Sequence, residues 1–391
     1  MKKFIYVLAA LLLSQCKTSS NKSGMGGLAE IDISKKYPVK ELHLQDITQI
    51  EYIPLETNLN TLMRSSARIV YVSDNYIVAS NTSDGDVFVF DGKGKSKFSF
   101  NRKGQSGTDY NQLYSIAFDE KEKEIYIFDQ FAANPKFLVY AEDGEFKRTF
   151  VSSSNFSPRF VGNFDDATLF AYDVYGLSQD RYSSKPYLLI SKTDGTIVDT
   201  LDIHLPVRVS DRKYFEVEVN GQKGIMPISL STVNNRSYGK NFLIADWSSD
   251  TIYKLTSQRE LQPVIVRKPS VQNSEPKTII SNELVTNKYI FLTKAIFDFD
   301  LAKSKGQFLT TNLMYDFENG QINEYKLVNK DFESINIEFR EAITPENIGV
   351  CLLDVAVLFE KDEAGKIKGE LKQLLKSLKE EDNPVLMKVK F

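Results

Sequence analysis

The stretch 113–150 constrains the fold of this chain more than any other; it reads LYSIAFDEKEKEIYIFDQFAANPKFLVYAEDGEFKRTF. It contains four short apolar runs, YSIAF, EIYIFD, KFLVY and FKRTF, and the connections between them are DEKEKE, QFAANPK and the turn Asp143-Gly144. Runs rich in Ile, Tyr, Phe and Val that are bounded by charged or turn-forming residues are typical of strands. The stretch therefore predicts a four-stranded antiparallel meander.

Weaker copies of this unit flank it on both sides. Asp-Gly turns begin at residues 91, 143 and 194, so their separations are 143 − 91 = 52 and 194 − 143 = 51. A sheet of four short strands cannot bury both of its faces alone, and repeats of this length are typical of propellers and solenoids. We therefore predict an all-β fold, a six-bladed β-propeller of four-stranded antiparallel blades.

The sixth blade requires both ends of the chain. Residues 47–55, ITQIEYIPL, form a lone predicted strand before the first repeat, and the last repeat keeps only VCLLDVAVLFE and VLMKVKF. Residues 366–381 separate these two runs and carry apolar residues at the spacing of one helical stripe. We expect one helix inserted in this last blade, and we expect residues 47–55 to complete it, because closing the ring in one blade covers otherwise open edges.

The first residues indicate export. Lys2 and Lys3 precede an apolar run, 4–13, which is too short to cross a bilayer as a helix of about 20 residues. A positive start followed by a short apolar core is typical of a signal peptide, predicted here over 1–15. The run ends in LSQC, which resembles the lipobox of bacterial lipoproteins and implies that Cys16 is lipidated; an ordinary signal peptide with an incidental cysteine is the alternative. The small, polar residues after Cys16 favour a flexible tether over 16–44, followed by the propeller over 45–391.

Charge and composition limit the classes of partner that this chain is expected to bind. The formal net charge is −3, and removing residues 1–15 with their two lysines leaves −3 − 2 = −5. The chain has no basic block that would neutralise phosphates, so we expect no nucleic-acid partner. Cys351 lies in an apolar run and is interpreted as a small buried core residue. We find no Pro/Gly/Ser linker after Gly27, so we expect a single domain and a monomer.

Three features carry a resemblance to a known family: the repeats themselves, the segment Arg102-Lys103-Gly104 followed by Tyr110, and the ending NPVL at 383–386. Together they resemble the six-bladed β-propeller lipoproteins of gut bacteria, whose repeats are similar to NHL repeats. The resemblance covers most of 45–391. It implies the propeller fold and a lipid-anchored location in the cell envelope, at the outer membrane, with the periplasmic or the surface side left open. It implies no particular activity.

Loop composition suggests which face of the ring binds. In a four-stranded blade, the loops between blades and the loops between the second and third strands share one face. These loops are long and rich in aromatic, Arg and Gln residues, whereas the turns on the other face are short and charged. We therefore predict a ligand site on the face with long loops, called here the loop face. Its candidate residues are Arg102, Tyr110, Gln130, Phe131, Arg159, Tyr175, Arg181 and Trp247. The alternative is that these aromatics pack between blades and that the arginines are solvated.

Catalytic patterns are sparse. The chain has only two histidines, His43 and His204, and neither has the spacing of metal ligands, so we expect no metal and no cofactor. Carboxylates are abundant, but no pair stands out. The sequence favours a protein that is not an enzyme: a lipid-anchored binding or scaffolding module for a glycan, a peptide or an envelope protein. The alternative is an envelope polysaccharide lyase or hydrolase that uses carboxylate, Tyr and Arg groups in the central funnel.

Overall fold

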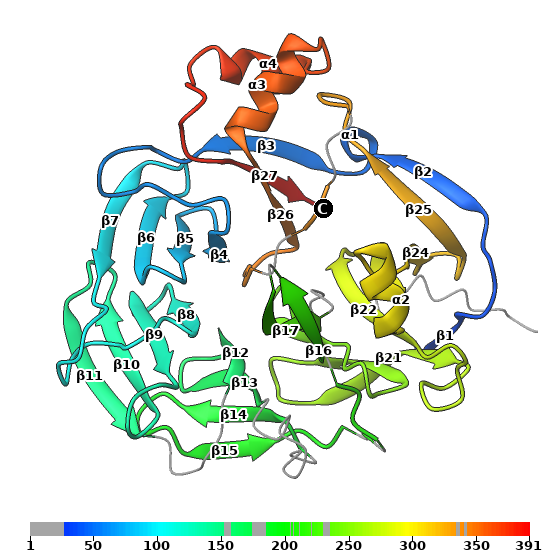
Figure 1. The fold of residues 1–391 in the computed structure, drawn as a ribbon, viewed down its shortest axis with the longest axis horizontal. Helices are drawn as coiled ribbons and strands as arrows, with labels where there is room; N and C mark the ends of the chain where they lie inside the picture. The colour runs from blue at the N-terminus through cyan, green and yellow to red at the C-terminus, as the bar shows by residue number, and fades with distance from the viewer. Residues whose placement is uncertain are drawn as a thin grey trace, which may run out of the picture.

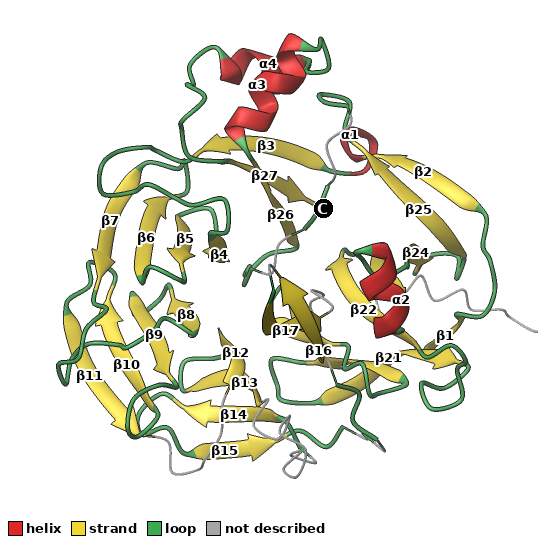
Figure 2. Cartoon of the chain, in the orientation of Figure 1, coloured by secondary structure: helices red, strands yellow, loops and turns green. Residues whose placement is uncertain are grey.

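The computed structural model shows a ring of six β-sheets arranged as blades around a central axis (Figure 1). It describes residues 27–151, 158–173, 185–203, 205, 207–210, 212–219, 221–229, 235–333, 337–339 and 342–391. The predicted six-bladed β-propeller is confirmed. Strands dominate the described part of the chain, and the helices lie outside the blades (Figure 2). None of the described helices is long and apolar enough to cross a membrane.

Blades 1, 2 and 3 are four-stranded antiparallel meanders that follow one another in sequence. Blade 1 consists of β4 (Arg68–Val72), β5 (Tyr76–Asn81), β6 (Asp86–Asp91) and β7 (Ser96–Asn101). Blade 2 consists of β8 (Ser115–Asp119), β9 (Glu124–Asp129), β10 (Lys136–Ala141) and β11 (Phe146–Val151). Blade 3 consists of β12 (Pro158–Asn163), β13 (Thr168–Asp173), β14 (Tyr187–Ser191) and β15 (Ile197–Thr200). The stretch 113–150 therefore corresponds to blade 2.

Blades 4 and 5 have five strands each. Blade 4 contains β18 (Asn235–Tyr238), β19 (Asn241–Ile244), β20 (Thr251–Leu255) and β21 (Leu261–Lys268). Blade 5 contains β22 (Thr278–Val285), β23 (Tyr289–Ile296), β24 (Thr310–Asp316) and β25 (Ile322–Val328). The fifth strands come from the N-terminal part of the chain: β1 (Ala29–Asp32) pairs in parallel with β21, and β2 (Val39–His43) pairs in parallel with β25.

These two strands correct the predicted boundary of the tether. Residues 16–44 were predicted as flexible, but the described residues 29–43 include β1 and β2. The physical reason is that β21 and β25 would otherwise present unpaired outer edges, which proteins commonly cover. The folded domain therefore begins before residue 45. Residues 1–26, which include the predicted signal peptide and Cys16, lie outside the described residues.

Blade 6 closes the ring with both ends of the chain, as predicted. Its strands are β26 (Ile348–Leu353), β27 (Val385–Lys390) and β3 (Gln49–Pro54), in that order from the axis outwards. β27 pairs antiparallel with β3 over six residues, from Val385 opposite Pro54 to Lys390 opposite Gln49. Blade 6 is the exception in strand number, because it has three strands and no innermost strand.

Two helices, not one, are inserted between β26 and β27: α3 (Val355–Glu363) and α4 (Gly369–Leu375). α4 lies within the predicted helical insert, but the run VAVLFE was predicted as strand and forms α3 instead. The carboxylate of Asp354 caps this helix by accepting a hydrogen bond from the N–H of Val357 at 3.1 Å. The buried residues of α3, Val355 and Leu358, are three positions apart, which is helical spacing.

Two further short helices occur in the described chain, α1 (Leu44–Ile47) between β2 and β3, and α2 (Phe299–Lys305) between β23 and β24. The long insertion after blade 3 contains an antiparallel hairpin of β16 (Arg212–Val219) and β17 (Gln222–Ser229). The hairpin lies toward the middle of the ring in Figure 1. α2 and β17 are in contact, so the hairpin is held against the loop that carries α2.

A short segment fills the position of the missing innermost strand of blade 6. Residues 342–346, called here the channel segment, run beside β4, and Ile343 forms a parallel bridge with Tyr71. The N–H of Val72 donates to the carbonyl of Ile343 at 3.0 Å, and the N–H of Ile343 donates to the carbonyl of Val70 at 3.0 Å. Ile343 packs against apolar clusters of blades 1 and 2 and of blades 3 and 4. The segment therefore obstructs the centre of the ring.

Candidate functional site

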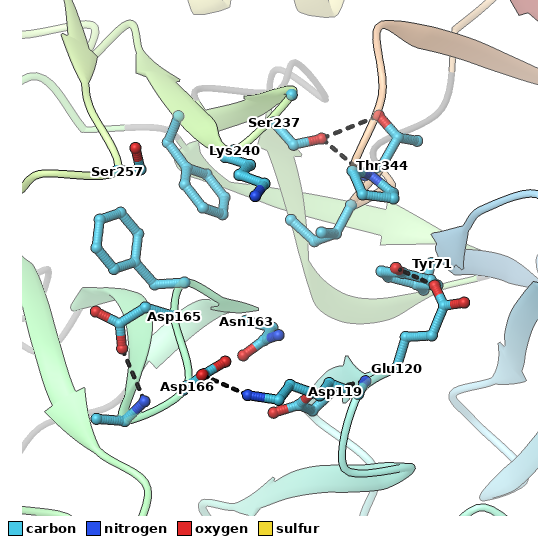
Figure 3. A pocket seen from close by; sticks show the side chains of 17 residues that line it. Tyr71, Asp119, Glu120, Asn163, Asp165, Asp166, Ser237, Lys240, Ser257 and Thr344 are labelled. Atoms are coloured by element: carbon cyan, nitrogen blue, oxygen red, sulfur yellow. Dashed lines mark hydrogen bonds and ion pairs between the residues drawn. The ribbon is translucent and has the colours of Figure 1, made fainter.

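A pocket of about 730 Å³ lies at one end of the central axis (Figure 3). Its walls are the turns between the first and second strands of blades 2, 3 and 4, together with Tyr71 at the inner strand of blade 1. Ile343, Thr344 and Pro345 of the channel segment also line it. These turns belong to the face opposite the loop face, so we call this cavity the turn-side pocket. Its volume lies within the usual range for small-ligand sites, about 300–1,000 Å³.

Blade 2 contributes two carboxylates with different surroundings. Asp119 is buried, and one of its carboxylate oxygens accepts a hydrogen bond from Lys192 Nζ at 2.5 Å. Glu120 projects toward Tyr71 (Figure 3); it accepts a hydrogen bond from the Tyr71 hydroxyl at 2.7 Å and another from the amide of Asn75 at 2.9 Å. Asp119 is therefore paired with a cation, whereas Glu120 is held by two uncharged donors.

Blade 3 contributes two further carboxylates, both paired with cations. Asp165 accepts hydrogen bonds from Arg259 at 2.8 Å and from the backbone N–H groups of Ala167 and Thr168. Burial of this carboxylate opposes its ionisation, but these hydrogen bonds outweigh burial and lower the pKa of Asp165. Asp166 accepts from Lys121 at 2.5 Å, and this hydrogen bond lowers the pKa of Asp166.

Lys240 is the remaining cation of the pocket. It follows Tyr238 and Gly239 in the turn after β18, and its side chain projects into the cavity (Figure 3). Among the described residues, its ammonium group has no hydrogen-bond or ion-pair partner. Lys240 is exposed, so its ammonium group is available to a ligand, whereas the side-chain carbonyl oxygen of Asn163 is buried and has no partner in this part of the chain.

Apolar surface lies between these polar groups. Phe164 is half-buried at the pocket wall, and its ring centroid lies 6.1 Å from that of the buried Phe242. Ile343 and Pro345 add aliphatic surface from the channel segment. An aromatic and aliphatic lining with a few oriented polar groups is the usual composition of a small-ligand site.

Three ionisable groups of the pocket, Tyr71, Asp165 and Asp166, have pKa values displaced from their ordinary ones. Burial, together with the hydrogen bond to the Glu120 carboxylate, raises the pKa of Tyr71 far above its usual value, so this phenol stays neutral at physiological pH. The pKa values of Asp165 and Asp166 are lowered, so neither carboxyl group serves as a proton donor near neutral pH. Among the described residues, no group of His, Cys, Asp and Glu side chains is arranged to hold a metal ion.

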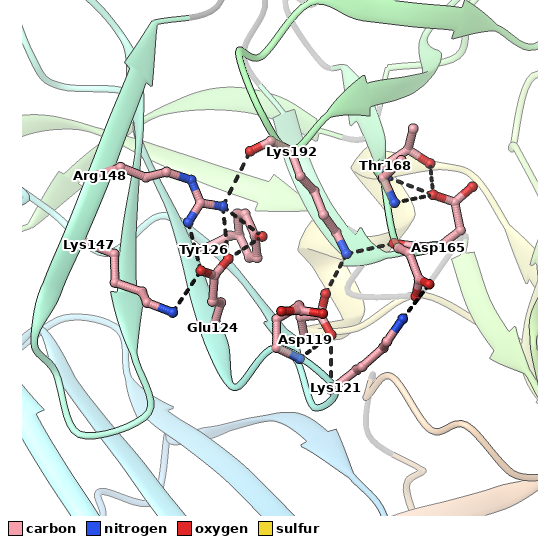
Figure 4. A network of polar contacts seen from close by, with 12 residues as sticks. Asp119, Lys121, Glu124, Tyr126, Lys147, Arg148, Asp165, Thr168 and Lys192 are labelled. Atoms are coloured by element: carbon pink, nitrogen blue, oxygen red, sulfur yellow. Dashed lines mark hydrogen bonds and ion pairs between the residues drawn. The ribbon is translucent and has the colours of Figure 1, made fainter.

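A polar network behind the pocket fixes the turns that form it (Figure 4). Lys192 Nζ donates to the Asp119 carboxylate and, at 2.6 Å, to the carbonyl of Asp165, so it joins the pocket turns of blades 2 and 3. Beside it, Glu124 accepts two hydrogen bonds from Arg148, at 2.7 and 2.8 Å, and one from Lys147 at 2.9 Å. The positions of Glu120 and Phe164 therefore depend on contacts between blades.

The predicted loop-face residues that the structure describes have different surroundings, and the backbone N–H of Arg102 donates to the Tyr110 hydroxyl at 2.9 Å. Tyr110 is completely buried, and its hydroxyl donates to the carbonyl of Gly85 at 2.6 Å, so this side chain is a packing residue. Arg102 is exposed, and its Nε donates to the carbonyl of Gly144 at 3.2 Å. Phe131 is 57 % exposed and contacts Tyr114 edge to face. Gln130 adjoins Phe131 and is only partly exposed.

Trp247 also differs from the prediction. It lies in the loop after β19, as expected, but its side chain is only 4 % exposed and packs with Phe297, Ala302 and Phe308 near α2. The expectation that this ring is available for stacking on a ligand is therefore wrong, because residues of α2 and Ile228 of β17 pack against it.

Of the other residues singled out in the sequence, some are described by the structure and some are not. Arg159 is exposed and lines a second pocket of about 60 Å³ beside the channel segment, on the side away from the turn-side pocket. Tyr175, Arg181 and His204 lie outside the described residues, as Cys16 does. Cys351 is a buried free cysteine, as predicted.

Sequence reasoning missed the turn-side pocket. Its turns were interpreted as solvated hairpin connections because they are short and charged. A usable signal exists in the sequence: the turn NFDD at 163–166 places Phe164, which lines the pocket, beside two acidic residues. A solvated turn has no need of an aromatic residue at this position.

Comparisons with known proteins agree with the fold. A protein described as exported, from Bacteroides fragilis NCTC 9343, superposes with a TM-score of 0.64 at 16 % identity, over 93 % of this chain and 99 % of its own. A protein of unknown function from Bacteroides caccae gives a TM-score of 0.33 at 10 % identity, over 68 % of this chain and 77 % of its own. Virginiamycin B lyase from Staphylococcus aureus gives 0.39 at 10 % identity, over 88 % and 99 %. The last two scores are too low to carry an argument.

No curated protein matches the sequence. One family model, described as "Domain of unknown function (DUF4934)", matches residues 28–390, which is nearly the whole described chain. That range begins just before β1 and ends at the last residue of β27, so the family unit coincides with the closed ring. The chain therefore belongs to the DUF4934 family.

Proposed function

We propose that this protein is a lipid-anchored binding module of the cell envelope, and that it holds its ligand in the turn-side pocket. The observation that carries this proposal is a cavity of about 730 Å³ with an apolar wall and an unpaired Lys240. The ligand is a glycan, a peptide or a segment of an envelope protein. The proposed site lies at the end of the axis opposite to the loop face.

The hydrogen bonds and ion pairs of the acidic side chains support binding rather than catalysis. Asp119, Asp165 and Asp166 are each occupied by a lysine or an arginine, and Glu120 is held by Tyr71 and Asn75. A glycosidase or lyase requires a carboxyl or phenol group whose pKa permits proton transfer. The lowered pKa values of Asp165 and Asp166 and the strongly raised pKa of Tyr71 do not favour this chemistry.

A pocket-filling substitution tests the location. Ala167 is exposed at the pocket wall, and Ala133 is exposed in a loop on the opposite face, so Ala133→Trp is a matched control for Ala167→Trp. Ligands found for the full chain on glycan and peptide arrays are titrated against both variants. We expect Ala167→Trp to abolish binding and Ala133→Trp to leave it unchanged. Binding that survives Ala167→Trp and is lost in Phe131→Ala places the ligand on the loop face and contradicts the proposal.

Anchoring at Cys16 is proposed from the LSQC motif, and the structural likeness to a protein described as exported supports an envelope location. A lipid on Cys16 leaves a short link of 17–28 before β1 begins at Ala29. Metabolic labelling with a fatty acid should mark the wild type and leave Cys16→Ser unlabelled. Fractionation of the labelled cells should recover the wild type with the outer membrane. Equal labelling of the two proteins contradicts the anchor.

A further inference from the structure

Among the residues that the structure describes, one negative and one positive side chain of the pocket, Glu120 and Lys240, have no partner of opposite charge. From this we infer that its ligand is zwitterionic: a short peptide with free termini, whose amino group lies at Glu120 and whose carboxylate lies at Lys240. This inference rests on the proposed binding function of the turn-side pocket and names its ligand class.

Glu120 differs from the other acidic residues of the pocket because it has no cationic partner among the described residues. Asp119 is neutralised by Lys192, Asp165 by Arg259 and Asp166 by Lys121. The two groups that hold Glu120, Tyr71 and Asn75, are both uncharged donors in the described chain. They orient the carboxylate without cancelling its charge, so Glu120 presents a fixed anion to a ligand amine.

Lys240 is isolated in the same way. The other cations near the cavity, Lys121, Lys192 and Arg259, each bind a carboxylate. The ammonium group of Lys240 has no such partner among the described residues, although it projects into the cavity (Figure 3). A ligand carboxylate is the group that would complete this charge, because a carboxylate and an ammonium group form a charge-assisted hydrogen bond.

The surface between the two charges is suited to the body of a peptide. Glu120 comes from blade 2 and Lys240 from blade 4, and the labelled side chains lie on different walls of the cavity (Figure 3). Phe164 and Ile343 line the same cavity and supply apolar contact for the body of the ligand. A neutral glycan would leave both charges without a partner.

Blocked peptides test the charge requirement directly. Di-, tri- and tetrapeptides that contain one phenylalanine are prepared with free termini, with an acetylated amino group, with an amidated carboxylate and with both termini blocked. Their dissociation constants for the full chain are measured by calorimetry at low salt. We expect the free-terminus form of one length to bind best, and each block to weaken binding about tenfold.

Variants then assign each terminus to a side chain. In Lys240→Met, amidation of the peptide carboxylate should no longer weaken binding, whereas acetylation of the amino group still should. In Glu120→Gln, acetylation should no longer weaken binding, whereas amidation still should. Lys95→Met and Glu122→Gln, which replace exposed turn residues outside the pocket lining, should bind as the wild type does.

Two results would overturn the inference. If the doubly blocked peptide binds as tightly as the free one and Ala167→Trp abolishes this binding, the pocket is a binding site but not one for zwitterions. If no peptide binds at millimolar concentration, peptides are excluded as ligands. The proposed binding function of the turn-side pocket is then tested independently of peptides, by the glycan arrays and the Ala167→Trp variant.

Discussion

The ion pair between Lys192 and Asp119 should stabilise both the ring and the pocket. Both side chains are nearly inaccessible, at 5 and 3 % exposure, and their charged atoms lie 2.5 Å apart. In Lys192→Met the methionine fills a similar volume but leaves the carboxylate buried without a cation. Removing one partner of a buried pair commonly costs about 3–5 kcal/mol of unfolding free energy.

The surroundings of Asp119 place the expected cost at the low end of that range. The carboxylate keeps two hydrogen bonds from backbone N–H groups, those of Lys121 at 3.0 Å and Glu122 at 3.2 Å, and these partly compensate its charge. The loss of the hydrogen bond from Lys192 to the carbonyl of Asp165 adds about 1 kcal/mol to this partly compensated cost. We therefore expect Lys192→Met to lower the free energy of unfolding by about 3 kcal/mol.

Denaturant titration of the full chain at pH 7 measures this cost. The matched control is Lys121→Met, which removes an ion pair to Asp166 whose two side chains are 64 and 78 % exposed. Exposed pairs contribute about 0–1 kcal/mol, so this control should unfold nearly as the wild type does. The double variant Lys192→Met, Asp119→Asn should recover part of the loss, because it leaves no buried charge. Equal midpoints for Lys192→Met and Lys121→Met would refute the reasoning.

Three further predictions concern the ring, its acid stability and its core. Deleting residues 1–56 removes β1, β2 and β3, so the unfolding midpoint of the whole domain should fall; an unchanged midpoint contradicts closure through β3. Burial opposes ionisation of Glu124, but hydrogen bonds from Arg148, Tyr126 and Lys147 lower its pKa to about 2. A lowered folded-state pKa gives stability that is present above about pH 4.5 and lost as the pH falls toward 2, so Glu124→Gln should show a shallower acid loss in denaturant titrations. Trp247→Ala should cost about 3–5 kcal/mol of unfolding free energy while ligand affinity is retained, and the opposite pattern contradicts its role in packing.

Local pattern was enough to predict most of the blades. The turn at Asp143 illustrates why: its carboxylate accepts a hydrogen bond from the N–H of Glu145, and Gly144 has a φ of +84°, which glycine adopts without strain. The apolar runs on either side of this turn form β10 and β11, which pair antiparallel. Pairing of β3 with β27 was also predictable, because an incomplete last repeat and a lone first strand have the same missing partner.

The errors arose where tertiary contacts decide between local alternatives. The run VAVLFE is equally apolar as a strand or as a helix, and the cap formed by Asp354 and the burial of Val355 and Leu358 favour the helix. The N-terminal strands β1 and β2 have little strand signal of their own. They form because β21 and β25 offer them unpaired edges, which no local pattern in residues 16–44 reveals.

The position of the pocket depends on the missing innermost strand of blade 6. Without that strand the axis is open on one side, and residues 342–346 enter the gap and bond to Val70 and Val72. Once Ile343 occupies the axis, it separates the space beside Arg159, about 60 Å³, from the turn-side pocket of about 730 Å³. In the described part of the chain, the channel segment therefore leaves a cavity large enough for a small ligand beside the short turns and a small one beside Arg159.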